Sequence, residues 1–211
     1  MSELAPMLSL DVRSLVSLRV VLPMYALLLV VYVVAWGPQM APPMFAVAGL
    51  IVSSTLFGMG ESSRLNLLYG TLPVRRRTVV RSHYLVSAAA LTALVGLGTL
   101  TGAAADAMRG TPDADLSSAT ATLGVTLVVM AIQQPATVRW GARGAAFGLL
   151  FVGLAASTLI VLIPPGLLPL GDAVSVAAQH AWLPWGVLAV GVGAFAASYP
   201  VAARIYERQD H

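Results

Sequence analysis

The chain has 211 residues, of which 58% are hydrophobic and only 10% are charged, with a formal net charge of +3. Soluble domains carry about 25% charged residues, so this composition excludes an ordinary soluble globular protein. Cysteine is absent, which excludes disulfides and thiolate metal sites. The excess of positive charge would be typical of nucleic-acid binding in a soluble protein. In a membrane protein the cytoplasmic bias of basic residues explains it, and we expect no nucleic-acid partner.

Six stretches with few or no charges are candidates for membrane-spanning helices. A helix needs about 20 mostly apolar residues to cross roughly 30 Å of hydrocarbon. In chain order the predicted spans cover residues 19–36, 43–60, 82–105, 118–138, 144–163 and 182–203. The segment from Gly37 to Pro43, which contains one glycine and three prolines, separates the first two. The sequence therefore predicts an all-α integral membrane protein, with one transmembrane domain over residues 1–211.

Residues 1–18 precede the first span and are amphipathic. Their apolar positions include Leu8, Leu10, Leu15 and Leu18, which are interspersed with serine, aspartate and arginine. We interpret the segment as a helix that lies in the membrane interface with its apolar face towards lipid. The alternative is a cytoplasmic extension of the first span. The acidic residues Glu3 and Asp11 and the missing small-residue cleavage site argue against a cleaved signal peptide.

The distribution of arginine predicts the orientation of the chain. Eleven of the twelve cationic residues fall on one side of the predicted spans: Arg13, Arg19, Arg64, Arg75, Arg76, Arg77, Arg81, Arg139, Arg143, Arg204 and Arg208. The opposite side carries Arg109 together with Asp106, Asp113, Asp115 and Asp172. Because cytoplasmic loops carry the excess of basic residues, we expect both termini in the cytoplasm. Lysine is absent and Ala, Val and Gly are abundant, a composition that suggests a bacterium with a genome rich in G and C, and hence its plasma membrane. The long connection at 164–181 is either a loop or a hairpin that re-enters the outer leaflet.

Residues 61–81, between the second and third predicted spans, form the most informative segment. Glu61 and Ser62 are typical of a helix start, Gly70 of a helix end, and Pro73 prevents continuation. A short amphipathic helix of this kind suits docking into a groove of a soluble partner. The alternative is a basic loop that contacts lipid headgroups and only sets the topology. The predicted partner-binding residues are Glu61, Ser62, Arg64, Leu65, Asn66, Leu68, Tyr69, Leu72, Pro73, Arg75, Arg76 and Arg77.

Several functional classes have no support in the sequence. It contains no phosphate-binding P-loop, no His-Glu-x-x-His pair and no Gly-x-Ser-x-Gly elbow, so we expect neither a catalytic nor a metal site, and no ATPase activity of its own. The centres of the predicted spans lack Asp, Glu, Lys and Arg, unlike those of proton-coupled carriers. His83 and His180 lie near span ends, where we interpret them as solvated side chains.

The stretch from Gly60 to Leu85 has an acidic residue after the second span, then Leu-Pro-Val-Arg-Arg at 72–76, and a tyrosine that enters the third span. This pattern resembles the membrane subunits of ABC-2 type ATP-binding cassette transporters, in particular the small six-span permeases that pair with a separate ATPase. Leu10 and Asp11 resemble part of the interfacial helix of that family. The family usually mixes lysine into the basic cluster, whereas this chain has only arginine.

The resemblance implies that residues 61–72 include a coupling helix seated on a nucleotide-binding subunit. It implies two permease subunits, identical or different, and two ATPases that bind ATP and Mg²⁺, with no cofactor in this chain. Candidate contacts between permease subunits are two small-x-x-x-small pairs, Gly98 with Gly102 and Gly144 with Gly148, although such pairs also arise by chance in glycine-rich spans.

The leading hypothesis for function is therefore an exporter permease with an amphipathic or hydrophobic cargo, such as a peptide, a lipid-like compound or an antibiotic. The absence of charge from the centres of the predicted spans favours such a cargo. A membrane module without transport activity, acting as a sensor, immunity or assembly protein, is the main alternative. A secondary carrier is a third, and would require inverted repeats and helices interrupted at the membrane midplane.

Overall fold

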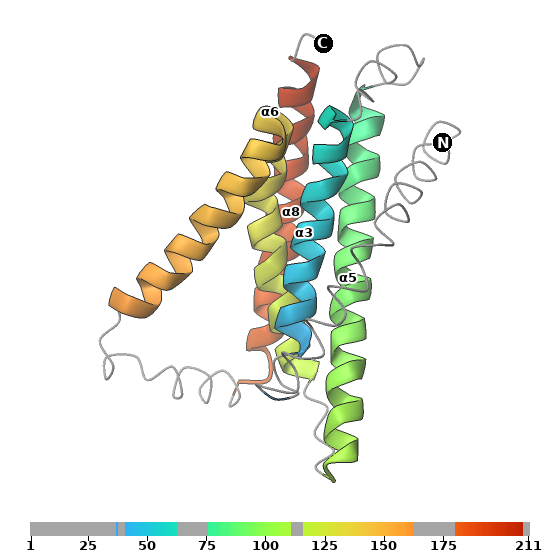
Figure 1. Ribbon diagram of the computed structural model, residues 1–211, viewed down its shortest axis with the longest axis vertical. Coiled ribbons are helices and arrows are strands. Elements are labelled where there is room, and N and C mark those ends of the chain that lie inside the picture. The colour runs from blue at the N-terminus through green and yellow to red at the C-terminus, as the bar shows by residue number, and fades with distance from the viewer. Residues whose placement is uncertain (1–36, 38–40, 63–75, 111–115, 163–179, 209–211) are drawn as a thin grey trace.

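The computed structural model describes residue 37 and residues 41–62, 76–110, 116–162 and 180–208 (Figure 1). Its helices are α3 (Ala41–Ser62), α5 (Arg76–Met108), α6 (Leu116–Leu162) and α8 (Leu183–Glu207). No strand occurs in these ranges, so the all-α prediction is confirmed for the part of the chain they cover. The interfacial helix at 1–18, the first span and the 164–181 connection lie outside the described residues, and the count of six spans stays a prediction.

Three described segments are long and apolar enough to cross a membrane: Arg77–Met108, Leu116–Gly141 and Leu183–Glu207. The apolar part of α3 found by the same criterion, Ala41–Ser54, is shorter. α5 has 33 residues and is therefore about 50 Å long, which exceeds the roughly 30 Å of a hydrocarbon core. Its surplus length lies at its charged ends, where Arg76, Arg77 and Asp106 are found.

α6 contains both the fourth and the fifth predicted spans, divided at Gly141. This residue has φ 60° and ψ −142°, which is not helical and lies in a region that residues with a Cβ rarely adopt. The chain reverses there, so that α6 has a first arm, 116–140, within the bundle and a second arm, 142–162, that diverges from it (Figure 1). The fourth and fifth predicted spans are thus connected by a turn at one glycine, without a longer loop between the two arms.

The bundle is held by two apolar clusters. The first joins α3, α5 and α6 through Ala46, Leu50, Leu91, Val95, Ala119, Leu127 and Met130. The second joins α5, α6 and α8 through Val80, Tyr84, Val138 and Ala202. Many large apolar side chains remain exposed on the outer faces, including Leu97, Leu100, Val190 and Val192. Such faces are expected where helices contact lipid, because lipid tails are as apolar as the side chains themselves.

Candidate functional site

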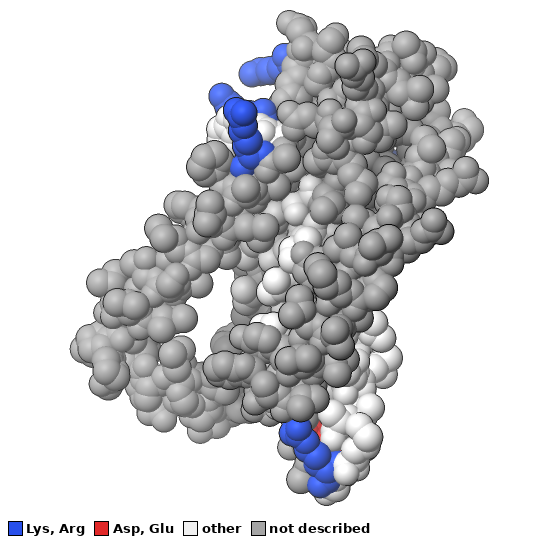
Figure 2. Space-filling view, in the orientation of Figure 1, with Lys and Arg blue, Asp and Glu red and all other residues white. Residues whose placement is uncertain are grey.

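One end of the bundle collects most of the described arginines, and we call it the arginine-rich end. α3 and α8 end there, α5 begins there and α6 reverses there (Figure 1). The arginines of this end are Arg76, Arg77, Arg81, Arg139, Arg143, Arg204 and Arg208. Figure 2 shows basic side chains at this end, and among the described residues the opposite end carries one arginine, Arg109, which follows α5. The charge asymmetry read from the sequence is therefore an asymmetry between the two ends of the folded bundle.

The predicted docking segment begins and finishes at the arginine-rich end. Glu61 and Ser62 are the last residues of α3, and Arg76 and Arg77 are the first of α5. The other predicted partner-binding residues lie outside the described residues: Arg64, Leu65, Asn66, Leu68, Tyr69, Leu72, Pro73 and Arg75. The docking helix itself thus stays a prediction, and its two flanking helices are adjacent in the bundle.

An ion pair joins the start of α5 to the end of α8. The Arg77 guanidinium donates through Nε to Glu207 Oε1 at 2.5 Å and through Nη2 to Glu207 Oε2 at 3.3 Å. Two parallel donors on one carboxylate fix the relative orientation of the two side chains. The side chains are 69% and 36% exposed, so water screens the attraction between their charges. Sequence reasoning selected Arg77 and missed Glu207, because the two are separated by 130 positions.

Below this ion pair, Tyr84 of α5 is buried against α8. Its Oη lies 3.1 Å from Ser198 Oγ, and Ser198 Oγ donates to the Phe195 carbonyl at 2.8 Å. Since the single hydroxyl hydrogen of Ser198 is used in that bond, Tyr84 is the donor to Ser198. The Tyr84 ring also packs on those of Phe195 and Tyr199, with centroids 5.0 and 5.6 Å away. α5 and α8 are thus joined by a hydrogen bond within an aromatic cluster.

The two histidines differ from each other in exposure. His180 is exposed just before α8, as expected for a solvated side chain near a span end. His83 is only 6% exposed, so the interpretation of this residue as solvated was wrong. The reason is the length of α5, which begins six residues before the predicted span and brings His83 inside the bundle.

A family model described as an ABC-2 family transporter protein matches residues 9–207, which is nearly the whole chain. The chain belongs to this family. No curated protein and no solved structure matches it significantly. Its family and its apolar helices make it a multi-pass membrane protein, and ABC-2 proteins are membrane components of transporters that are not themselves ATPases. The resemblance carried by residues 60–85 is therefore confirmed at the level of the family.

Within its helices the ABC-2 protein has a cluster of neutral polar side chains. Gln134 Nε2 of α6 donates to Ser53 Oγ of α3 at 2.5 Å and lies 3.3 Å from Ser87 Oγ of α5. The neighbouring Gln133 is 2% exposed, and neither its Nε2 nor its Oε1 has a hydrogen-bond partner among the described residues. The cluster joins three helices through the amide nitrogen of Gln134, whose Oε1, like both amide atoms of Gln133, has no partner among the described residues.

We expect leucine to be tolerated better at position 133 than at position 134. Gln133→Leu replaces an unpaired amide, whose burial costs about 1–3 kcal/mol, so the free energy of unfolding should stay equal or rise. Gln134→Leu removes bonds to two helices at about 0.6 kcal/mol each but also one unpaired amide oxygen, so this variant should be less stable than Gln133→Leu by about 1 kcal/mol or more. Thermal unfolding in mild detergent measures both. Equal destabilisation by the two variants would show that the Gln133 amide has a partner.

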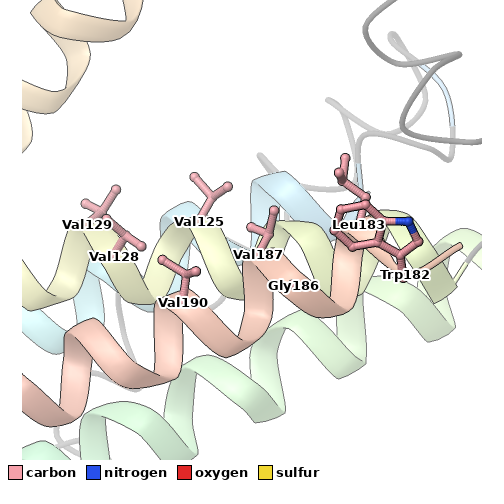
Figure 3. A pocket seen from close by; sticks show the side chains of 8 residues that line it. All are labelled: Val125, Val128, Val129, Trp182, Leu183, Gly186, Val187 and Val190. Atoms are coloured by element: carbon pink, nitrogen blue, oxygen red, sulfur yellow. The ribbon is translucent and has the colours of Figure 1, made fainter. Parts of the chain in front are cut away.

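An apolar groove lies between the first arm of α6 and the start of α8, towards the end opposite the arginines. Figure 3 shows the residues that line it: Val125, Val128, Val129, Trp182, Leu183, Gly186, Val187 and Val190. Its volume is about 480 Å³, within the range of small-molecule sites. The described lining residues carry no charge, so the groove is suited to apolar groups.

The structure places the predicted interface glycines of the ABC-2 protein as follows. Gly98 is buried against α3, where a Cβ would lie 3.0 Å from the Ala41 carbonyl oxygen and from the Phe45 Cβ. Gly102 is buried in α5, and Gly144 packs directly on the Ala136 carbonyl within α6. Gly148 lies in the second arm of α6, whose side-chain surroundings are outside the described part. Gly98 and Gly144 therefore serve contacts inside the chain, and their role between subunits stays a prediction.

Proposed function

We propose that this ABC-2 protein is the permease subunit of an ATP-driven exporter in the bacterial plasma membrane and works with a separate ATPase. The observation that carries the proposal is the family match over residues 9–207. The arrangement of the chain supports it, because the helices on both sides of the docking segment meet at the arginine-rich end. By the positive-inside rule this end faces the cytoplasm, where an ATPase is available.

In this proposal, two ATPase subunits bind ATP and Mg²⁺, and this chain binds neither. Each ATPase receives the coupling helix within residues 61–72 of one permease subunit, and two permease subunits, identical or different, complete the transporter. When the ATPases approach each other, their displacement reaches the spans through α3 and α5. The two states of the spans must differ in their affinity for nucleotide-bound ATPase, since an equilibrium shifts only by differential binding.

The proposed cargo is amphipathic or hydrophobic, for example a peptide, a lipid-like compound or an antibiotic. The apolar groove of α6 and α8 supports an apolar part of the cargo. The neutral cluster around Gln134 supports uncharged polar groups rather than ions, since the described residues that form it are glutamine and serine. The cargo leaves along the interface of the two subunits or laterally into lipid.

The proposal is tested by purification from the native membrane in mild detergent. We expect an ATPase with a P-loop to co-purify in a fixed ratio, and to be lost when residues 61–77 are scrambled. A variant with residues 110–115 scrambled, at the opposite end, is the control and should retain the ATPase. A preparation without any ATPase would contradict the proposal and favour a membrane module that does not transport.

A further inference from the structure

We propose that Arg77, Tyr84, Ser198 and Glu207 form a clasp that makes α8 move together with the start of α5. A displacement by the ATPase would then move α8, the last span, as well as α5. Because α8 forms one wall of the apolar groove, the groove would change its width. The inference rests on the proposed function, because it requires a displacement delivered at residues 61–77. It names α8 as the helix that receives this displacement.

Arg77 lies where a displacement of the docking segment enters α5. It is the last of the predicted docking residues and lies in the first turn of α5. Within a helix the backbone transmits axial displacement, so a movement delivered at the start of α5 reaches Arg77 directly. Glu207, at the far side of the ion pair, is the last residue of α8.

The clasp has two anchors on one face of α5. Tyr84 follows Arg77 by about two helical turns, so the ion pair and the Tyr84–Ser198 hydrogen bond are about 10 Å apart along α5. Val80 lies between them, 1% exposed, and belongs to the same apolar cluster as Ala202 of α8. Two polar contacts with apolar packing between them prevent α5 and α8 from tilting independently of each other.

The two anchors contribute in different ways. The ion pair is exposed, so it orients the two helix ends more than it stabilises them. The Tyr84 hydroxyl is buried, and breaking its bond to Ser198 would leave a polar group unpaired in an apolar setting, which is costly. Pro200, which removes a backbone hydrogen bond within α8, lies between Ser198 and Glu207, so the anchors hold α8 on both sides of this weak point.

α8 also has a natural pivot beyond the clasp. Gly191 meets the backbone of Gly124 in α6, and no side chain intervenes at this crossing. The clasp lies on one side of the crossing, and the groove residues Leu183 and Val187 lie on the other. A displacement at Glu207 therefore tilts α8 about Gly191 and moves the groove wall in the opposite sense. The width of the groove is thereby linked to the state of the ATPase.

The test measures the groove directly, with spin labels at Val125→Cys on α6 and at Trp182→Cys, at the start of α8 and far from the crossing at Gly191, in the purified complex with its ATPase. The chain has no native cysteine, and both positions are exposed on opposite walls of the groove. We expect the distance between the labels to change when Mg²⁺, ATP and vanadate are added. Arg77→Glu and Glu207→Arg should each lose most of that change, and the double variant with both substitutions should recover it.

Further variants show whether a loss of the distance change comes from the clasp contacts or from a general effect on charge or folding. Glu207→Gln keeps the shape of the side chain and should also reduce the change, as should Tyr84→Phe. Arg204→Glu alters an exposed charge at the same end and should leave the change intact. The inference would be overturned if either single charge reversal kept the full nucleotide-induced change in label distance. It would also be overturned if the double variant unfolded at the original temperature and still failed to recover that change. If no ATPase binds the unmodified protein, the proposed function fails first and the inference with it.

Discussion

Gly191→Ala is expected to lower the free energy of unfolding by about 3 kcal/mol, at the upper end of the usual cost of overpacking. The Cβ of alanine at 191 would lie directly on the carbonyl oxygen of Gly124. The corresponding change at Gly124 would place a Cβ 2.7 Å from backbone atoms of Val187 and Leu188. Because the obstacle is backbone on both sides, no side chain can rotate away, and α6 and α8 must separate along their contact.

The matched control is Gly193→Ala, two residues later in α8. A Cβ at Gly193 has nothing within 4 Å, so this variant should gain up to about 1 kcal/mol from the higher helix propensity of alanine. Thermal unfolding of both variants in the same detergent gives the comparison. If Gly191→Ala proved as stable as Gly193→Ala, the close approach of α6 and α8, and with it the pivot of α8, would be wrong.

Gly141→Ala is expected to cost about 2–3 kcal/mol, because it forces a side chain into a backbone conformation that is close to exclusive to glycine. Gly141 has φ 60° and ψ −142° and is the residue at which α6 reverses. The two arms also touch close to the turn, since Gly144 packs on the carbonyl of Ala136. An alanine at 141 can relieve its strain only by opening the angle between the arms.

Gly96→Ala in α5 is the control for this prediction, because the position is exposed and a Cβ there meets nothing within 4 Å. It should raise the unfolding temperature slightly, whereas Gly141→Ala should lower it. A neutral effect of alanine at 141 would mean that the arms are joined by an ordinary helical or loop residue. The hairpin described for α6 would then be incorrect.

Hydropathy located the helices well and their ends less well. The predicted spans 43–60 and 182–203 correspond to α3 (Ala41–Ser62) and α8 (Leu183–Glu207). The third span was expected from residue 82, yet α5 begins at Arg76. An apolar run marks the part of a helix that lies in hydrocarbon, and the hydrogen-bonded backbone continues through the charged residues at the headgroup level. This extra turn and a half is what buries His83 and brings Arg77 to Glu207.

The sequence by itself determined the class of the protein, five of the helical segments and the distribution of charge between the ends of the bundle. Each of these follows from composition along the chain, and the motif at residues 60–85 was enough to indicate the family. The part of the docking segment at 63–75 is an inference from sequence alone, since it lies outside the described residues.

Only the tertiary structure decided which polar residues meet. Gln134 with Ser53 and Ser87, Tyr84 with Ser198, and Arg77 with Glu207 are pairs separated by 47 to 130 positions. Their contacts depend on the rotation of each helix about its axis. In a membrane helix the face towards lipid and the face towards protein are both apolar, so hydrophobic periodicity does not distinguish them. The rotation of each helix about its axis is set by its packing against the other helices. At the crossing of Gly124 and Gly191 it is set by the close approach of two backbones. Neither can be read from the sequence of one helix.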